Sequence, residues 1–171
     1  MKSAMRFALA GMMLGLIVPL VIGQQTGNDV PESELVGTWR LESRVVRQGG
    51  KIISDSDLGE LPVGYLMYDS TGHMSVQLMK RRRSAKIECS DVPAPQNNTL
   101  TVNGFQAYFG TYVVEPKAHT VIHHLEGAIA NVDVGKTLPR HFELSGDKLL
   151  IIVPASSSQE REVTLHWSRV K

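Results

Sequence analysis

The sequence has little of several features that would identify a function. It contains one cysteine, Cys89, so no disulfide can form within the chain. Its 18 basic and 17 acidic residues nearly balance, which excludes the excess positive charge of a general nucleic-acid binder. It also lacks Cys-x-x-Cys, His-Glu-x-x-His, Ser-His-Asp and phosphate-binding glycine motifs. We therefore predict no metal site, no cofactor and no nucleic-acid partner.

The one long apolar run lies at the N-terminus. Lys2 and Arg6 precede an apolar stretch from Phe7 to about Ile22, and small or apolar residues follow up to Gly23. This is the layout of a secretory signal peptide. We predict cleavage after Gly23 and a secreted or periplasmic protein with no membrane span in its mature form. The alternative is an uncleaved N-terminal membrane anchor, although a span needs roughly 20 apolar residues and this run is shorter.

After the N-terminal segment the sequence alternates between apolar and polar residues with a period of two. Residues 24–34 are polar, contain Pro31 and predict an extended linker before one domain over residues 35–171. A period of two is typical of strands with one buried face. The first strand, residues 36–47, is expected to place these residues on one face: Gly37, Trp39, Leu41, Ser43 and Val45. Further strands are predicted over residues 63–69, 73–79, 110–115, 120–126, 140–144, 149–154 and 162–170, with a short helix over residues 99–108.

The spacing of these segments indicates an all-β fold. About eight short strands follow one another through turn sequences such as Gln48-Gly49-Gly50-Lys51 and Ser145-Gly146-Asp147, without an internal repeat. This pattern fits an antiparallel up-and-down barrel or a sandwich. A barrel would remove the exposed edges that an open sheet of this size leaves.

Several stretches resemble one family. The first strand opens with Gly37-Thr38-Trp39 and the last ends with Trp167-Ser168-Arg169. Between them, in order, lie PVGYLMY at 62–68, GHMSVQ at 72–77, AYFGTY at 107–112, HHLEG at 123–127 and RHFEL at 140–144. Together they are similar to the bacterial and fungal lipocalin-like domain family over residues 35–171. The Thr-Asp-Tyr motif of true lipocalins is absent.

The resemblance implies an eight-stranded lipocalin-like barrel with an internal cavity. It also implies that Arg169 stacks over Trp39, beside Gly37, and closes one end of the barrel. A guanidinium over an indole face gains about 0.5–2 kcal/mol. The alternation of the two strands agrees, since Trp39 and Arg169 both fall on the apolar side.

The most polar part of the predicted barrel is the stretch from His123 to Glu126. Neighbours on a strand face opposite sides, so His123 and His124 cannot enter a cavity together or hold one metal. His124 and Glu126 share a face, and if that face is internal, Arg140 on the next strand could pair with Glu126. The candidate ligand-binding residues are therefore Tyr68, Gln77, Tyr112, His124, Glu126 and Arg140.

A fixed polar cluster inside an apolar pocket is the composition of a ligand site. We predict an exported barrel that binds a small hydrophobic molecule in its cavity, and we assign no catalytic residue. Two alternatives stay open. One is an isomerase or cyclase that uses His124 and Glu126 as acid and base. The other is a structural envelope protein whose barrel is filled by its own side chains. The oligomeric state is not predicted.

Overall fold

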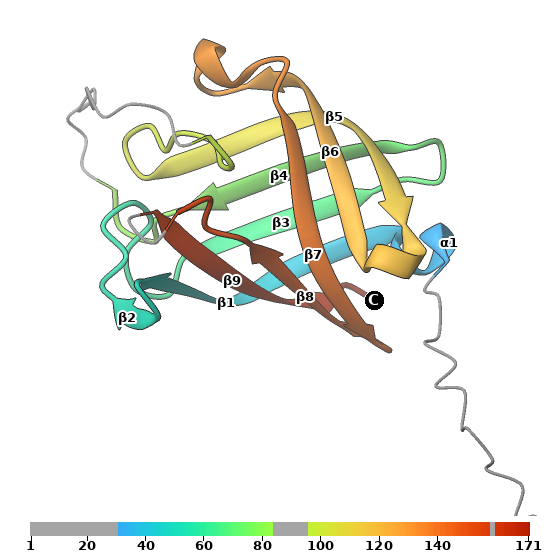
Figure 1. Cartoon of the computed structure of the whole chain (residues 1–171), viewed down its shortest axis with the longest axis horizontal. Helices are drawn as coiled ribbons and strands as arrows, with labels where there is room; N and C mark the ends of the chain where they lie inside the picture. Colours follow the sequence, from blue (N-terminus) through green and yellow to red (C-terminus); the bar gives the residue numbers. More distant parts are fainter. Residues whose placement is uncertain (1–30, 84–95, 158–159) are drawn as a thin grey trace, which may run out of the picture.

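The computed structural model describes residues 31–83, 96–157 and 160–171 (Figure 1). The predicted signal segment lies outside the described residues. Within them the elements, in chain order, are α1 (Glu32–Leu35), β1 (Gly37–Gln48), β2 (Lys51–Ile53), β3 (Val63–Tyr68), β4 (His73–Met79), β5 (Phe105–Glu115), η1 (Pro116–Ala118), β6 (Thr120–Ala128), η2 (Asn131–Asp133), β7 (Thr137–Ser145), β8 (Lys148–Val153) and β9 (Arg161–Arg169).

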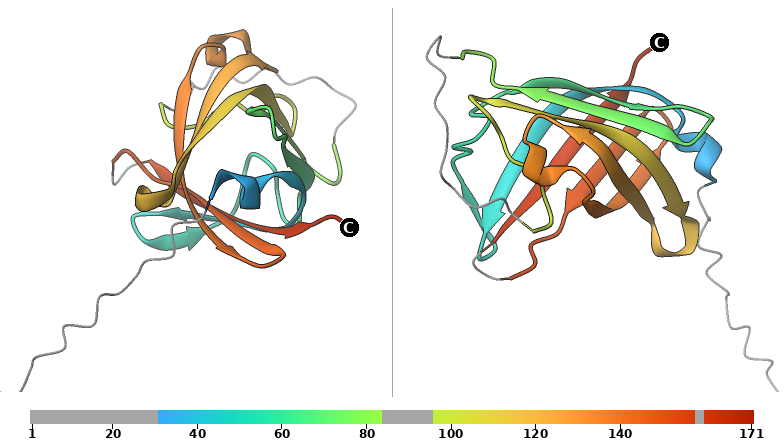
Figure 2. Two further views of the ribbon diagram at one scale, coloured as in Figure 1. Left: turned by 90° about the vertical axis from the view of Figure 1, so that its right-hand side faces the viewer. Right: turned by 90° about the horizontal axis from the view of Figure 1, so that it is seen from above.

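The strands form a closed antiparallel barrel. Each of β3 to β9 pairs with the next strand along the chain, β1 pairs with β3, and β9 returns to pair with β1. β1 and β3 to β9 make the eight-stranded barrel, and the short β2 pairs with the far end of β1. The ring of strands is visible along the barrel axis in the left view of Figure 2. The predicted eight-stranded barrel is therefore confirmed.

The segment before β5 differs from the prediction. The predicted helix over residues 99–108 is wrong, because β5 already begins at Phe105. Asn103 and Gly104 have φ values of 46° and 68°, in the left-handed region. They form a turn that brings Val102 and Phe105 together through two backbone hydrogen bonds of 2.8 and 2.9 Å. The short helix is instead α1, in the segment for which we predicted an extended linker.

A bulge in β1 changes which side chains face the interior. The register against β9 shifts between Leu41 and Ser43. Trp39 and Leu41 point inward before the bulge, as predicted, but Arg44 and Val46 point inward after it. The prediction that Ser43 and Val45 share the inner face was therefore wrong, since one extra residue inverts the alternation.

The inner faces of the strands form one hydrophobic core. Its fully buried members include Trp39, Leu66, Leu138, Phe142 and Leu149. Each strand contributes alternate residues to this core, as the period of two requires. The core leaves polar side chains inside the barrel as well, and these form the candidate site.

One end of the barrel is closed by Arg169, Trp39 and α1. The Arg169 guanidinium lies 4.1 Å from the centre of the Trp39 ring, and the Trp39 indole N–H donates to the Leu35 carbonyl at 2.9 Å. Arg169 also donates to the carbonyls of Val36 and Glu34, at 2.6 Å each. The left view of Figure 2 shows α1 lying across this opening. The predicted stacking of Arg169 on Trp39 is confirmed.

Gly37 is a glycine for two physical reasons. Its φ of 141° is one that residues with a side chain rarely adopt, and a Cβ there would lie 2.7 Å from Nη1 of Arg169. The glycine of the Gly-x-Trp sequence therefore makes room for the guanidinium that covers the tryptophan.

Candidate functional site

Three buried polar side chains project into the barrel from neighbouring strands. Tyr108 comes from β5, His123 from β6 and Arg140 from β7. They are 7, 2 and 2 % exposed, respectively. The other inward-facing residues of these strands are mostly apolar. On β6, for example, Val121 and Leu125 face the interior on either side of His123. The alternation of the strands therefore fixes a polar cluster in an otherwise apolar interior.

His123 lies between two tyrosine hydroxyls. The hydroxyl of Tyr68 is 2.7 Å from Nε2, and that of Tyr108 is 3.3 Å from Nδ1. A neutral imidazole has one donor and one acceptor nitrogen. One tyrosine therefore donates to His123 while the other accepts from it, and the accepting hydroxyl keeps its own proton for another partner. The hydroxyl of Tyr108 also interacts with the guanidinium of Arg140.

The pKa values of this cluster are set by burial. Burial lowers the pKa of His123 well below its ordinary value, and the nearby Arg140 charge lowers it further. Burial also raises the pKa of Tyr68 well above its ordinary value and raises the pKa of Tyr108. His123 is therefore neutral, and both tyrosines keep their protons, at physiological pH.

A pH dependence of stability follows from His123. The unfolded chain binds a proton at this histidine below about pH 6.5, whereas the folded chain does not. The free energy of unfolding should therefore fall as the pH drops from about 6.5 toward 5, by up to about 1.4 kcal/mol per pH unit. Urea unfolding across this range should show a shallower slope for His123→Gln. The control is His124→Gln, a change at the exposed neighbouring residue, and an equal flattening by this control would contradict the assignment.

Arg140 is a buried cation without a carboxylate partner among the described residues. Its Nη1 donates to the carbonyls of Asn97 and Pro139, at 3.0 and 2.9 Å, and to the side-chain oxygen of Asn97 at 3.2 Å. Its Nη2 forms no hydrogen bond within the described part of the chain. Burial lowers the pKa of Arg140, but an arginine stays protonated in proteins. The barrel therefore holds one positive charge that is only partly compensated.

The polar cluster borders a cavity inside the barrel. Its volume is about 30 Å³, which is room for about two water molecules. Most of its wall is apolar, and its lining includes Leu66, Val76, Leu78, Ile151, Val153, Val163 and Leu165. Its polar lining consists of Arg44, Asn98, Gln106, Tyr108, His123, Arg140 and Trp167, whose indole N–H is a donor. The Trp167 N–H, like Nη2 of Arg140, has no hydrogen-bond partner among the described residues.

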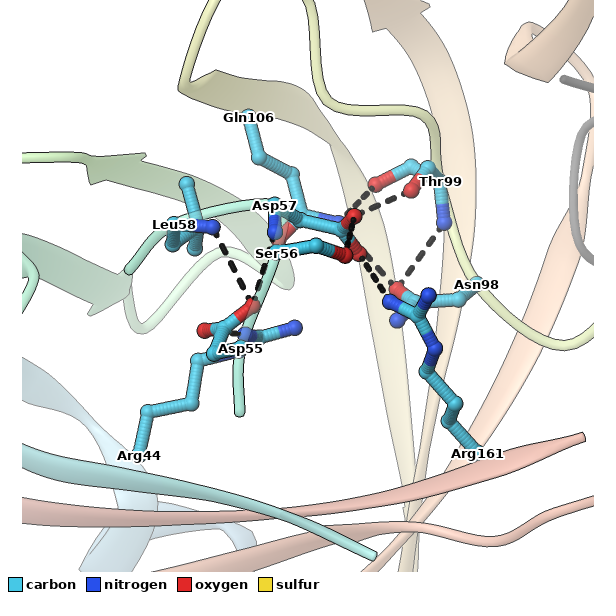
Figure 3. Close-up of polar contacts among 9 residues, drawn as sticks. All are labelled: Arg44, Asp55, Ser56, Asp57, Leu58, Asn98, Thr99, Gln106 and Arg161. Carbon is cyan, nitrogen blue, oxygen red and sulfur yellow. Dashed lines mark hydrogen bonds and ion pairs between the residues drawn. The ribbon is translucent and has the colours of Figure 1, made fainter. Parts of the chain in front are cut away.

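Polar contacts tie two loops, residues 54–61 and 96–104, to side chains of β1, β5 and β9 (Figure 3). Asp55 forms an ion pair with Arg44 and accepts the backbone N–H groups of Asp57 and Leu58, at 3.0 and 3.1 Å. The side-chain amide of Gln106 donates to Asn98 and Thr99, and Asp57 pairs with Arg161 at 3.0 Å. These bonds fix the chain around the mouth of the cavity.

Three of the predicted site residues lie in the interior. Arg140 lines the cavity, and Tyr68 supports it through His123. Tyr112 is buried, but its hydroxyl donates to the carbonyl of Asp69 at 2.8 Å, away from the cavity lining. Burial raises the pKa of Tyr112 to about 12. The hydroxyl of Tyr112 is therefore already hydrogen-bonded to the backbone of Asp69.

The other three predicted residues lie outside the barrel. Gln77, His124 and Glu126 are exposed on the outer face, and His124 contacts Thr137 at 3.1 Å. The expectation that His124 and Glu126 face inward was wrong, because the apolar pair Val121 and Leu125 takes the interior and places His123 between them. Arg140 consequently does not pair with Glu126.

Sequence reasoning missed His123, Tyr108, Gln106, Arg44 and Trp167 as cavity residues. The signal for His123 was present, since it alternates with Val121 and Leu125. The sequence contains no signal for Arg44, because the bulge between Leu41 and Ser43 turns its side chain to the face opposite the one that the alternation predicts. Trp167 was placed correctly on the apolar face of its strand, but nothing in the sequence indicates that its N–H lacks a partner.

The comparisons with known proteins agree with this architecture. The model of the lipocalin-like domain family matches residues 36–170. The chain belongs to the lipocalin-like domain family. No curated protein and no solved structure matches it. In the described residues of this lipocalin-like barrel, histidine, cysteine and carboxylate side chains nowhere gather as a metal site. None of its described helices has the length and apolar character to cross a membrane.

Proposed function

We propose that the protein is an exported barrel that binds a small hydrophobic molecule in its internal cavity. The observation that carries this proposal is the cavity itself, whose wall is mostly apolar and whose polar groups include Tyr108, His123 and Arg140. Binding pockets for small molecules have this composition. The basic and apolar N-terminal segment supports export.

The size of the cavity limits the ligand. A volume of about 30 Å³ is small beside the roughly 150 Å³ of an engineered protein cavity that binds benzene. A ligand larger than a few atoms must therefore move side chains of the wall. The segments at the end opposite α1, residues 54–61 and 96–104, carry no long helix or strand, and a ligand that opens this end must break hydrogen bonds of Asp55, Asn98 and Thr99.

The test is native mass spectrometry of the protein purified from its host without denaturation. We expect a mass excess from a small hydrophobic molecule, which Val163→Phe should lose because the larger ring fills the cavity. Val113→Phe is the matched control, since Val113 is 51 % exposed on the outer face. A panel of alcohols and acids from butanol and butyrate to decanol and decanoate should also raise the melting temperature of the unmodified protein by a few degrees.

A negative result in both measurements would contradict the proposal. Circular dichroism of Val163→Phe and Val113→Phe first establishes that both variants fold. If folded Val163→Phe keeps the mass excess, the ligand binds in another part of the protein.

The small volume favours a second candidate function. In this alternative the barrel is filled by its own side chains and acts as a structural protein of the envelope. The N–H donors of Arg140 and Trp167 oppose it, because they have no partner among the described residues and line a cavity that can hold one. The enzyme alternative loses its proposed acid and base, since His124 and Glu126 lie on the outer surface.

A further inference from the structure

Two buried hydrogen-bond donors on the cavity wall have no partner among the described residues. They are Nη2 of Arg140 and Nε1 of Trp167, and both side chains are 2 % exposed. Leaving a buried donor unpaired is unfavourable, and more so where the donor is charged. Native proteins keep few such groups, and a buried donor on a cavity wall points to an occupant of that cavity, such as a water, an ion or a ligand. Both donors line one cavity, so one molecule can reach both.

The charge around Arg140 indicates what kind of ligand group is missing. The partners of its Nη1 are uncharged carbonyl and amide oxygens of Asn97 and Pro139. Arg140 also interacts with the hydroxyls of Tyr68 and Tyr108, the latter through a hydrogen bond, and with the imidazole of His123, all of which burial keeps neutral. The other cavity-lining cation, Arg44, already has Asp55 as its partner. A buried cation with only neutral neighbours binds an anion strongly.

We infer that the ligand is a small organic acid whose carboxylate binds Arg140. The inference rests on the proposed function and names the ligand class of that cavity. The carboxylate accepts from Nη2 of Arg140, the indole N–H of Trp167 donates to a second acceptor of the same ligand, and the hydrocarbon part lies against the apolar wall. The hydroxyl of Tyr108, which lies 3.3 Å from Nδ1 of His123, also lines the cavity. Because the cavity holds about 30 Å³, the hydrocarbon part is accommodated by movement of the wall side chains.

The experiment compares hexanoate with 1-hexanol, which has the same carbon chain and no charge. Titration followed by NMR at pH 7.5 should give a dissociation constant for hexanoate at least about tenfold below that for hexanol, the difference expected for one hydrogen bond to a charged group. Arg140→Gln should lose this preference and bind both molecules about equally. Arg47→Gln is the control, because Arg47 pairs with Glu162 at the surface.

Each outcome separates the inference from the proposed function. Equal binding of hexanoate and hexanol by the unmodified protein would overturn the inference and leave hydrophobic binding standing. Binding of neither would overturn both. Displacement of hexanoate by chloride or sulfate at equal ionic strength would make the cavity an inorganic anion site and also overturn the inference. If Arg140→Gln does not fold, Arg140→Lys, which keeps the charge and loses the planar donors, should retain a reduced preference.

Discussion

Trp39→Ala should lower the free energy of unfolding by about 3–5 kcal/mol, the range for large core truncations. Trp39 is fully buried, its N–H donates to the Leu35 carbonyl, and the Arg169 guanidinium covers its ring at 4.1 Å. The substitution removes the packing, the hydrogen bond and the cation–π contact together, and it leaves a cavity where α1 closes the barrel. Urea unfolding followed by circular dichroism measures the change.

The control for this prediction is Tyr65→Ala. Tyr65 is also an aromatic residue of the barrel, but it lies on the outer face and is 46 % exposed. Its removal should cost less than about 1 kcal/mol. A loss of stability for Trp39→Ala no larger than that of Tyr65→Ala would mean that Trp39 does not close the barrel.

Arg44→Met should lower the free energy of unfolding by about 3–5 kcal/mol as well. The side chains of Arg44 and its partner Asp55 are 3 and 8 % exposed, so the substitution leaves a buried carboxylate without its cation. Adding Asp55→Asn should restore much of the loss, because it removes the charge and keeps the oxygen that accepts the N–H groups of Asp57 and Leu58.

The matched control is Arg47→Met, three residues further along β1. Arg47 and Glu162 lie 3.8 Å apart with side chains 37 and 44 % exposed, and exposed pairs of this kind contribute about 0–1 kcal/mol. Equal losses for Arg44→Met and Arg47→Met would contradict the buried ion pair. A double variant as unstable as Arg44→Met alone would show that the unpaired charge is not the cause.

The barrel could be predicted from the sequence because its signals are local and repeated. β4 runs over His73–Met79 as predicted, and the other predicted strands overlap observed ones. The contact of Trp39 with Arg169 spans the whole domain, and it was predicted from the resemblance to the lipocalin-like family, with which the alternation of the two strands agrees. The sequence-based predictions are wrong where single residues interrupt the two-residue alternation of the strands. The turn at Asn103 and Gly104 removes the predicted helix, and the bulge in β1 turns Arg44 inward.

The site was harder to predict because it depends on which face of a strand is inside. For β6 the choice lay between His123 with Val121 and Leu125, and His124 with Ile122 and Glu126. Two adjacent histidines give no preference, and the apolar residues on both faces weaken the alternation. The surroundings of Arg140, which hold no carboxylate partner among the described residues, depend on contacts with Pro139 of β7 and with the distant Asn97, which no local pattern contains.

The most direct test of the cavity as a binding site uses the two tryptophans of the chain. Protein labelled with ¹⁵N at tryptophan gives one indole N–H resonance for each, and Trp167→Phe assigns them. The Trp39 N–H is already bound to the Leu35 carbonyl, whereas the Trp167 N–H lies on the cavity wall and has no partner in the part of the chain that the structure describes. Titration with hexanoate should move the Trp167 resonance saturably and leave that of Trp39 in place. A Trp167 resonance that stays fixed, or one that moves only together with that of Trp39, would contradict binding inside the barrel.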